Sequence, residues 1–172
     1  ILRVTGSGFR PYAAHCHDEV ECNLVMRGTA AYLMHGRRYP LRPNALIWLF
    51  PAQEHVLIDP SPDLDLWVVA VHAPRLDALL PGCLDPALLA RDPPGHFLRP
   101  LAGVEAGRLA RLIAEVDRDR PAANGFNAGL ATVLLRAWRL FHIGDPEAGR
   151  ALHPAVDIAA QLLARRDPPP SL

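Results

Sequence analysis

The pattern of histidines and carboxylates between residues 15 and 28 constrains this chain more than any other feature. The segment is His-Cys-His-Asp-Glu-Val-Glu-Cys-Asn-Leu-Val-Met-Arg-Gly. Side chains alternate between the two faces of a β-strand, so a regular strand directs His15, His17 and Glu21 to the same face. Two imidazoles and one carboxylate on one face form half of a metal site. The other half must come from a facing strand, and His55, which follows an apolar run, is the candidate.

These four residues suit a divalent metal of the first transition row, which accepts imidazole nitrogen and carboxylate oxygen readily. Three histidines and one glutamate leave one or two coordination positions open, as a ligand or a substrate requires. The alternative is that the histidines are structural or merely exposed, because a chance His-x-His is not rare in a chain with eight histidines. Spacing alone leaves both interpretations open.

Composition narrows the class of protein. A chain of 172 residues, half of them hydrophobic, is long enough for one globular domain with a real core. Its formal net charge of zero gives no electrostatic case for nucleic-acid binding by the chain as a whole. Three cysteines without a framework spacing argue against a disulfide scaffold and favour a reducing cytoplasm. No apolar run approaches the ~20 residues that a membrane span needs.

The first 73 residues predict about seven short strands separated by tight turns, the pattern of a sandwich or barrel. Two strands flank Gly28, and Gly36 marks the turn of a hairpin. Residues 1–14 are expected to include a short strand, and residues 30–41 are expected to form a hairpin. The other expected strands in this part of the chain are 19–27, 29–35, 45–50, 55–58 and 64–71, and a further short strand is expected at 96–98.

After Pro74 the sequence pattern becomes typical of helices. Residues 75–80 and 85–91 predict short helical turns, and the apolar spacing over 103–119 and 127–143 predicts two amphipathic helices. Two helices joined by a short loop pack antiparallel. A third helix is expected over 153–165. It has no packing partner after it, so we expect the chain to be a piece of a longer protein.

The first motif resembles that of the cupin superfamily: His15-x-His17, three residues, Glu21, six residues and Gly28. The family implies a small antiparallel β-barrel, a double-stranded β-helix or jelly roll, with a metal inside its mouth. The segment that leads to His55 resembles the second cupin motif less closely. Asn44 and Ala52 stand at positions where glycine is common in that family, and these departures affect turn geometry more than ligand identity.

Residues 17–28, 32–39 and 46–55 together resemble the sensor domains of AraC-type bacterial transcription regulators. In that family a cupin barrel is followed by a helical hairpin that dimerises and then by two DNA-binding helix-turn-helix units. The resemblance implies a sensor barrel over 1–102, a dimerising hairpin over 103–150, and the start of a truncated DNA-binding domain over 151–172. It implies a cytoplasmic protein without catalytic activity that binds DNA only through the missing C-terminal domain and has no membrane partner.

The expected partners are a small-molecule effector, a second copy of the chain and a divalent metal. Metal affinity follows the Irving–Williams order, so zinc or nickel is expected in the isolated protein, on His15, His17, Glu21 and His55. Asn23 and His72 are candidate effector-binding residues, although Asn23 could just line the barrel and His72 could be structural. The expected dimer contact is the apolar stripe of Leu130, Val133, Leu134, Ala137 and Phe141.

A metal-dependent cupin enzyme, such as a dioxygenase or an isomerase, is the alternative interpretation. The same four ligands would serve it, because function resides in the site and not in the fold. The sequence offers no obvious additional acid or base near the pocket. The order of barrel, hairpin and unpartnered third helix therefore favours the regulator.

Overall fold

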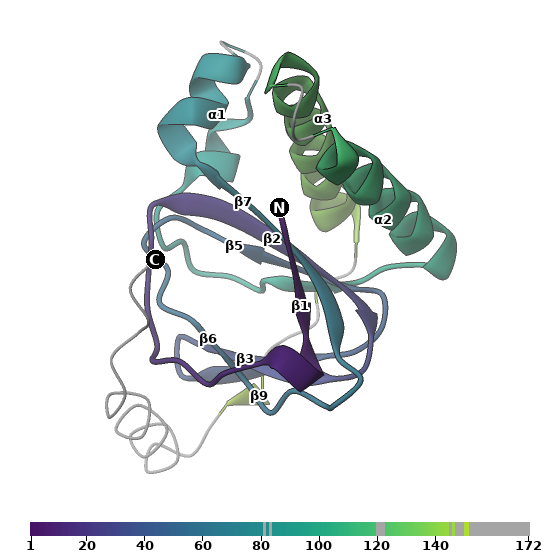
Figure 1. Ribbon diagram of the computed structural model, residues 1–172. Helices are drawn as coiled ribbons and strands as arrows, with labels where there is room; N and C mark the ends of the chain where they lie inside the picture. Colours follow the sequence, from purple (N-terminus) through teal and green to yellow (C-terminus); the bar gives the residue numbers. More distant parts are fainter. Residues whose placement is uncertain (81, 83, 120–122, 145, 147–149, 152–172) are drawn as a thin grey trace.

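The computed structural model describes residues 1–80, 82, 84–119, 123–144, 146 and 150–151. Two antiparallel β-sheets face each other, and two long helices lie across the outer side of one of them (Figure 1). The helices are α2 (Gly103–Arg118) and α3 (Ala123–Ile143), which pack against each other. The predicted fold class, a mainly β barrel of the jelly-roll type followed by an antiparallel helical hairpin, is confirmed.

Nine short strands form the two sheets in the described part of the chain. They are β1 (Leu2–Thr5), β2 (Glu19–Arg27), β3 (Ala30–Met34), β4 (Arg37–Leu41), β5 (Ala45–Leu49), β6 (Val56–Ile58), β7 (Asp65–His72), β8 (Leu98–Pro100) and β9 (Arg150–Ala151). The order is β1-β7-β2-β5-β8 in the larger sheet and β6-β3-β4-β9 in the smaller one. The chain crosses between the sheets several times, after β2, β4, β5, β6 and β8, which gives the two facing sheets of a jelly roll.

Strand β2 begins later than a regular strand through the first motif would. It starts at Glu19, after a bend at Asp18, whereas His15 forms an isolated antiparallel bridge with His55. The reason is that the chain changes sheets here. His15 pairs just ahead of β6 in the smaller sheet, and β2 pairs with β5 and β7 in the larger sheet. The first motif therefore spans a sheet-to-sheet crossing and not one continuous strand.

The two faces of β2 have different surroundings. Asn23 donates a hydrogen bond to Tyr32 Oη on β3, so its face of the larger sheet is directed at the smaller sheet, into the barrel. Cys22 lies opposite Trp48 on β5, and the Trp48 ring packs 4.8 Å from the Trp138 ring of α3, centroid to centroid. The alternation predicted from the sequence thus separates a barrel-lining face from a face that the hairpin covers.

Three positions near the motifs require a left-handed backbone. Gly28 has φ of 70°, and a Cβ there would lie 2.6 Å from the backbone of Leu64. Asn44 and Ala52 have φ of 68° and 64°. Glycine adopts this conformation at no steric cost and asparagine tolerates it, whereas alanine is strained in it. A glycine at either of the last two positions would adopt this conformation without strain.

The helical part follows the predicted order with shifted boundaries. Helix α1 (Ala73–Leu79) and a 3₁₀ turn, η2 (Pro86–Leu89), precede β8. Helix α3 begins at residue 123, four residues before the predicted start at 127. Gly125 lies inside the helix, where its low helix propensity costs only about 1 kcal/mol. The predicted third helix over 153–165 lies outside the described residues, as does the segment 152–172.

The stripe predicted as a dimer contact lies in the core of the chain itself. Val133, Leu134 and Ala137 are 0% exposed, and Leu130 and Phe141 are 8% and 6% exposed. Helix α3 packs these side chains toward α2 and β5. Side chains buried to this extent within the single chain offer little surface to a second copy, so the stripe is explained by the chain's own core. Dimerisation itself stays a prediction, without assigned contact residues.

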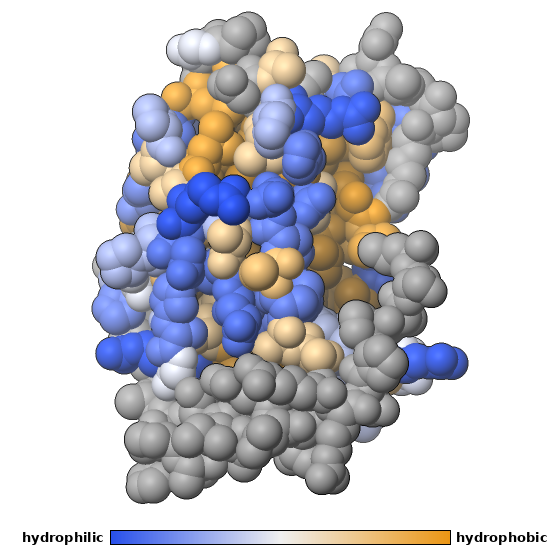
Figure 2. All heavy atoms as spheres, turned by 90° about the vertical axis from the view of Figure 1, so that its left-hand side faces the viewer, coloured by the Kyte–Doolittle hydropathy of each residue, from blue (hydrophilic) through white to orange (hydrophobic). Residues whose placement is uncertain are grey.

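The surface of the described residues carries few large apolar side chains, among them Val104, Leu135 and Ile143 on the hairpin. The face in Figure 2 is mostly hydrophilic, with smaller apolar patches between the polar side chains. None of the helices in the described part of the chain is long and apolar enough to span a membrane.

Candidate functional site

Three of the four predicted metal ligands come together at one end of the barrel. His15, His17 and His55 each offer a nitrogen, and these three atoms all lie within 4.8 Å of one another. The ring centroids of His15 and His55 are 4.5 Å apart, and those of His17 and His55 are 5.0 Å apart. We call these three residues the histidine cluster.

Backbone hydrogen bonds hold the histidine cluster together. The amide of His15 donates to the carbonyl oxygen of His55 at 3.1 Å, and the amide of His55 donates back to His15 at 2.9 Å. The Ala52 amide donates to the carbonyl oxygen of His17 at 2.7 Å. Both histidines of the first motif are therefore fixed by the segment that leads into β6. Their convergence does not depend on side-chain contacts alone.

The surroundings of His55 determine which of its nitrogens is free to bind a ligand. Its Nδ1 lies 2.8 Å from the carbonyl oxygen of Gln53, and a carbonyl only accepts, so Nδ1 carries the proton. Burial lowers the pKa of His55 to about 4, so the ring is neutral near pH 7. Its Nε2 therefore keeps a lone pair, and the carbonyl bond orients the ring in the manner of second-shell partners at metal sites.

Glu21 lies beside the cluster and not within the group of mutually close donor atoms. Its Oε2 is 3.3 Å from Nε2 of His17, and its Oε1 accepts a hydrogen bond from Asn23 at 2.8 Å. The side chain is nearly buried. Burial opposes its charge, but the hydrogen bond with His17, the attraction of His55 and the Asn23 bond together lower the pKa of Glu21. Glu21 is therefore an anion held against His17.

The other two histidines of the cluster have opposite pKa shifts. The hydrogen bond with Glu21 raises the pKa of His17, whereas burial, reinforced by the positive charge that His17 can carry, lowers the pKa of His15. His17 Nδ1 lies 3.4 Å from Glu19 Oε2 but makes no hydrogen bond, although the atom is buried. A buried nitrogen without a partner is costly unless another group, such as a metal ion, satisfies it.

Two tyrosines that the sequence interpretation did not select flank the cluster. The Tyr12 ring lies 5.2 Å from the ring of His15, and the Tyr32 ring lies 5.9 Å from that of His55. Burial and the charge of Glu21 raise the pKa of Tyr12 to about 12, so its hydroxyl stays protonated. Tyr32 lies in a predicted strand, on the face that is directed into the barrel, so strand alternation could have identified it. Tyr12 lies outside every predicted strand and offered none.

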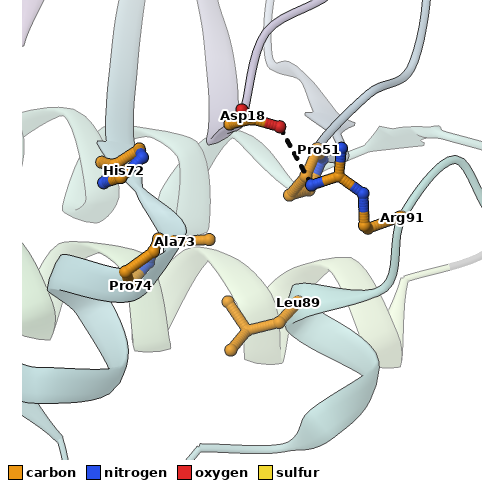
Figure 3. A pocket seen from close by; sticks show the side chains of 7 residues that line it. All are labelled: Asp18, Pro51, His72, Ala73, Pro74, Leu89 and Arg91. Carbon is orange, nitrogen blue, oxygen red and sulfur yellow. Dashed lines mark ion pairs between the residues drawn. The ribbon is translucent and has the colours of Figure 1, made fainter.

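The two candidate effector residues lie in different places. Asn23 is fully buried in the barrel, between Glu21 and Tyr32, and its Oδ1 has no hydrogen-bond partner among the described residues. His72 is exposed at the end of β7, where it lines a separate cavity together with Asp18 (Figure 3). The structure therefore groups Asn23 with the histidine cluster and places His72 outside it.

The donor set of the cluster fits a divalent transition metal. Three imidazoles at mutual distances of a few ångström, one of them with an oriented ring, match the nitrogen-rich sites that zinc, nickel and copper prefer. Nδ1 of His17 makes no hydrogen bond to the described residues, although Glu19 Oε2 lies 3.4 Å away, so this nitrogen is available to a metal ion. Glu21 adds a negative charge beside the cluster, which offsets the charge of a bound cation.

Comparison with known proteins agrees with this fold. No curated protein sequence matched the chain significantly. Among solved structures, the AraC-like transcriptional activator CuxR is similar over 86% of this chain, with 13% identity and a TM-score of 0.51. A crystal structure of an apo variant of ToxT from Vibrio cholerae matches 91% of this chain with 11% identity and a TM-score of 0.48. The chain spans 50% of the CuxR chain and 66% of the ToxT chain.

At such low identity the likeness to CuxR establishes the fold alone. The family model of the AraC-like ligand binding domain, in contrast, matches the sequence over residues 3–135, which is well over half of the chain. That range includes every strand of the barrel from β2 to β8, the histidine cluster and the start of α3. The chain belongs to the family of AraC-like ligand-binding domains.

Proposed function

We propose that this chain is the sensor of an AraC-type transcription regulator and that it recognises a small-molecule effector beside the histidine cluster. The observation that carries the proposal is the convergence of His15, His17 and His55 at one end of the barrel. Polar groups that converge at the mouth of a barrel are the usual features of a ligand site. The family assignment supports a ligand-binding role.

A divalent transition metal forms part of this proposed site, with zinc or nickel expected in the isolated protein. His15, His17 and His55 would hold it. A metal on three protein ligands supplies a Lewis-acidic position that an oxygen or nitrogen atom of the effector can occupy. Glu21, which the sequence suggested as a fourth ligand, acts in this proposal by orienting His17 through its 3.3 Å contact.

Residues around the cluster would give the effector its orientation. Asn23 Oδ1 is a buried acceptor without a partner, so an effector hydroxyl or amine that reaches it would relieve an uncompensated polar group. Tyr12 and Tyr32 offer protonated hydroxyls and ring edges beside His15 and His55. A polar molecule with several hydroxyl or amine groups fits this lining better than a purely apolar one.

The regulatory output of such a sensor requires two states of the protein. An effector shifts the equilibrium only as far as its affinities for the two states differ. In this proposal DNA is contacted by a separate domain of the longer protein, and a second copy of the chain joins it in a homodimer.

Metal content tests the ligand assignment directly. We expect elemental analysis of the purified chain to find about one zinc or nickel ion per chain in the wild type and none in His15→Ala/His17→Ala. The control His96→Ala/His142→Ala removes two exposed histidines outside the cluster and should keep the metal. Equal metal content in all three proteins would refute the assignment.

A further inference from the structure

A cavity lies outside the histidine cluster. Its volume is about 460 Å³, within the roughly 300–1,000 Å³ that is usual for small-molecule sites. It opens between the bend before β2, the end of β7 and the segment around η2. The residues that line it are Asp18, Pro51, His72, Ala73, Pro74, Leu89 and Arg91.

One ion pair forms the charged wall of this cavity. Asp18 Oδ1 lies 2.9 Å from Arg91 Nη1, and Figure 3 shows the pair bridging one side of the cavity. The two side chains are 63% and 64% exposed, so water screens the pair and it contributes little to stability. Groups of a ligand can therefore replace each partner at small cost.

The remaining walls are mostly apolar and stiff. Pro51 and Pro74 contribute rings with fixed backbone, and Leu89 reaches toward the open centre (Figure 3). His72 belongs to the lining of the cavity and lies at the end of β7. A ligand here needs an apolar body beside a charged head.

We propose that this cavity binds a small zwitterion with an apolar body, the chemistry of an α-amino acid with an aliphatic side chain. Its carboxylate would pair with Arg91 and its ammonium with Asp18, while its side chain would lie against Leu89. A simple carboxylate would pair with Arg91 but meet the like charge of Asp18, and a simple amine would meet Arg91. A zwitterion can replace both halves of the Asp18–Arg91 pair and so leave each charge with a partner, whereas a ligand of one charge can compensate only one of them.

The position of the cavity gives such a ligand a regulatory route. Asp18 directly follows His17 of the histidine cluster, and Arg91 lies on the segment that follows η2. Asp85, which caps η2, accepts a hydrogen bond from the Trp138 indole of α3 at 3.1 Å. An occupant that touches both Asp18 and Arg91 would therefore connect the barrel end with the segment that is attached to the helical hairpin.

Isothermal titration calorimetry of the whole chain with four matched molecules tests the ligand class. Leucine carries both charges and the apolar body, 4-methylpentanoate lacks the ammonium, 3-methylbutylamine lacks the carboxylate, and glycine lacks the apolar body. We expect leucine to bind about tenfold or more tightly than each of the others. Absence of leucine binding, or equal binding of 4-methylpentanoate, would overturn the proposal.

Variants test the position of the site. Asp18→Asn and Arg91→Gln should each weaken leucine binding about tenfold. The controls Glu115→Gln and Arg111→Gln change exposed charges on α2 and should leave binding unchanged. Circular-dichroism melts check that all four proteins fold. Wild-type affinity in both cavity variants would overturn the assignment.

Amino acids also chelate metals, so the titrations are made with EDTA present and repeated with His15→Ala/His17→Ala. Undiminished leucine binding by that variant supports the separate cavity. Loss of binding there would assign leucine to the histidine cluster and overturn the inference. The result is independent of whether the cluster holds a metal, so this proposal and the proposed metal site can fail separately.

Discussion

His15 and His55 exchange both of their backbone hydrogen bonds, although 40 positions separate them in the sequence. Such a reciprocal pair places the two side chains on the same side of the ladder. The distance between their ring centroids, 4.5 Å, follows from this pairing. The histidine cluster is thus built where the chain passes from one sheet to the other.

The pH dependence of metal binding should report on Glu21. Glu21 raises the pKa of His17 above its ordinary value of 6.5, whereas His15 and His55 have lowered pKa values. A proton therefore competes with metal first at His17, and we expect affinity to fall as the pH drops through the raised pKa of that residue. In Glu21→Gln this pKa should fall, so metal should persist to lower pH in a chelator-competition assay.

Two other results for Glu21→Gln have clear meanings. A large loss of metal at every pH would show that Glu21 is itself a ligand, as the sequence suggested. An unchanged pH midpoint would contradict the positioning role that its contact with His17 indicates.

Replacing Ala52 with glycine should stabilise the protein. Ala52 has φ of 64°, a conformation in which a Cβ is strained by roughly 1–2 kcal/mol. Glycine relieves that strain but gains freedom in the unfolded chain, so the net gain expected in urea unfolding is about 1 kcal/mol. Asn44→Gly is the matched control and should gain less, because asparagine tolerates its φ of 68°. A destabilised Ala52→Gly would contradict the strain argument.

The stability of the barrel should fall in acid partly through Asp65. Arg3 Nε and Nη2 donate to the two carboxylate oxygens at 2.7 and 2.6 Å, and this hydrogen bonding lowers the pKa of Asp65. The stabilisation is complete above the ordinary carboxyl pKa of 3.8 and is lost as the pH falls through the lowered value.

We therefore expect Asp65→Asn to lose about 1 kcal/mol at pH 7, since Arg3 is half-exposed and the pair is partly screened. Urea unfolding between pH 2 and pH 7 should show a smaller pH dependence in this variant. Asp63→Asn, at an exposed position two residues away, should keep the wild-type dependence. Equal slopes for wild type and Asp65→Asn would refute the assignment.

Leu134 and Leu135 offer a direct test of the buried stripe on α3. Leu134 is 0% exposed and Leu135 is 37% exposed. Leu134→Ala should cost about 3 kcal/mol of unfolding free energy because it leaves a cavity, whereas Leu135→Ala should cost about 1 kcal/mol or less. A folded Leu134→Ala of wild-type stability that becomes monomeric in sedimentation experiments would restore the dimer assignment of the stripe.

The ligand face could be predicted because strand alternation is a local rule. It placed Glu21 and Asn23 on one face of β2, and the structure directs that face into the barrel. The same rule could not show that β2 begins only at Glu19, because the change of sheets depends on pairing with a distant segment. The apolar stripe of α3 could also be predicted from the sequence. Its periodicity does not tell whether the stripe packs against the same chain or against a second copy.

The sequence by itself determined the order of strands and helices, the faces of each and the candidate histidines, since these follow from periods of two and 3.6 residues and from turn chemistry. Only the tertiary structure decided which residues contact one another. It joined His15 to His55, separated His72 from Asn23, buried Leu134 within the chain and brought Asp18 against Arg91. Such contacts depend on how two sheets and a hairpin pack, and that packing is a property of the whole chain.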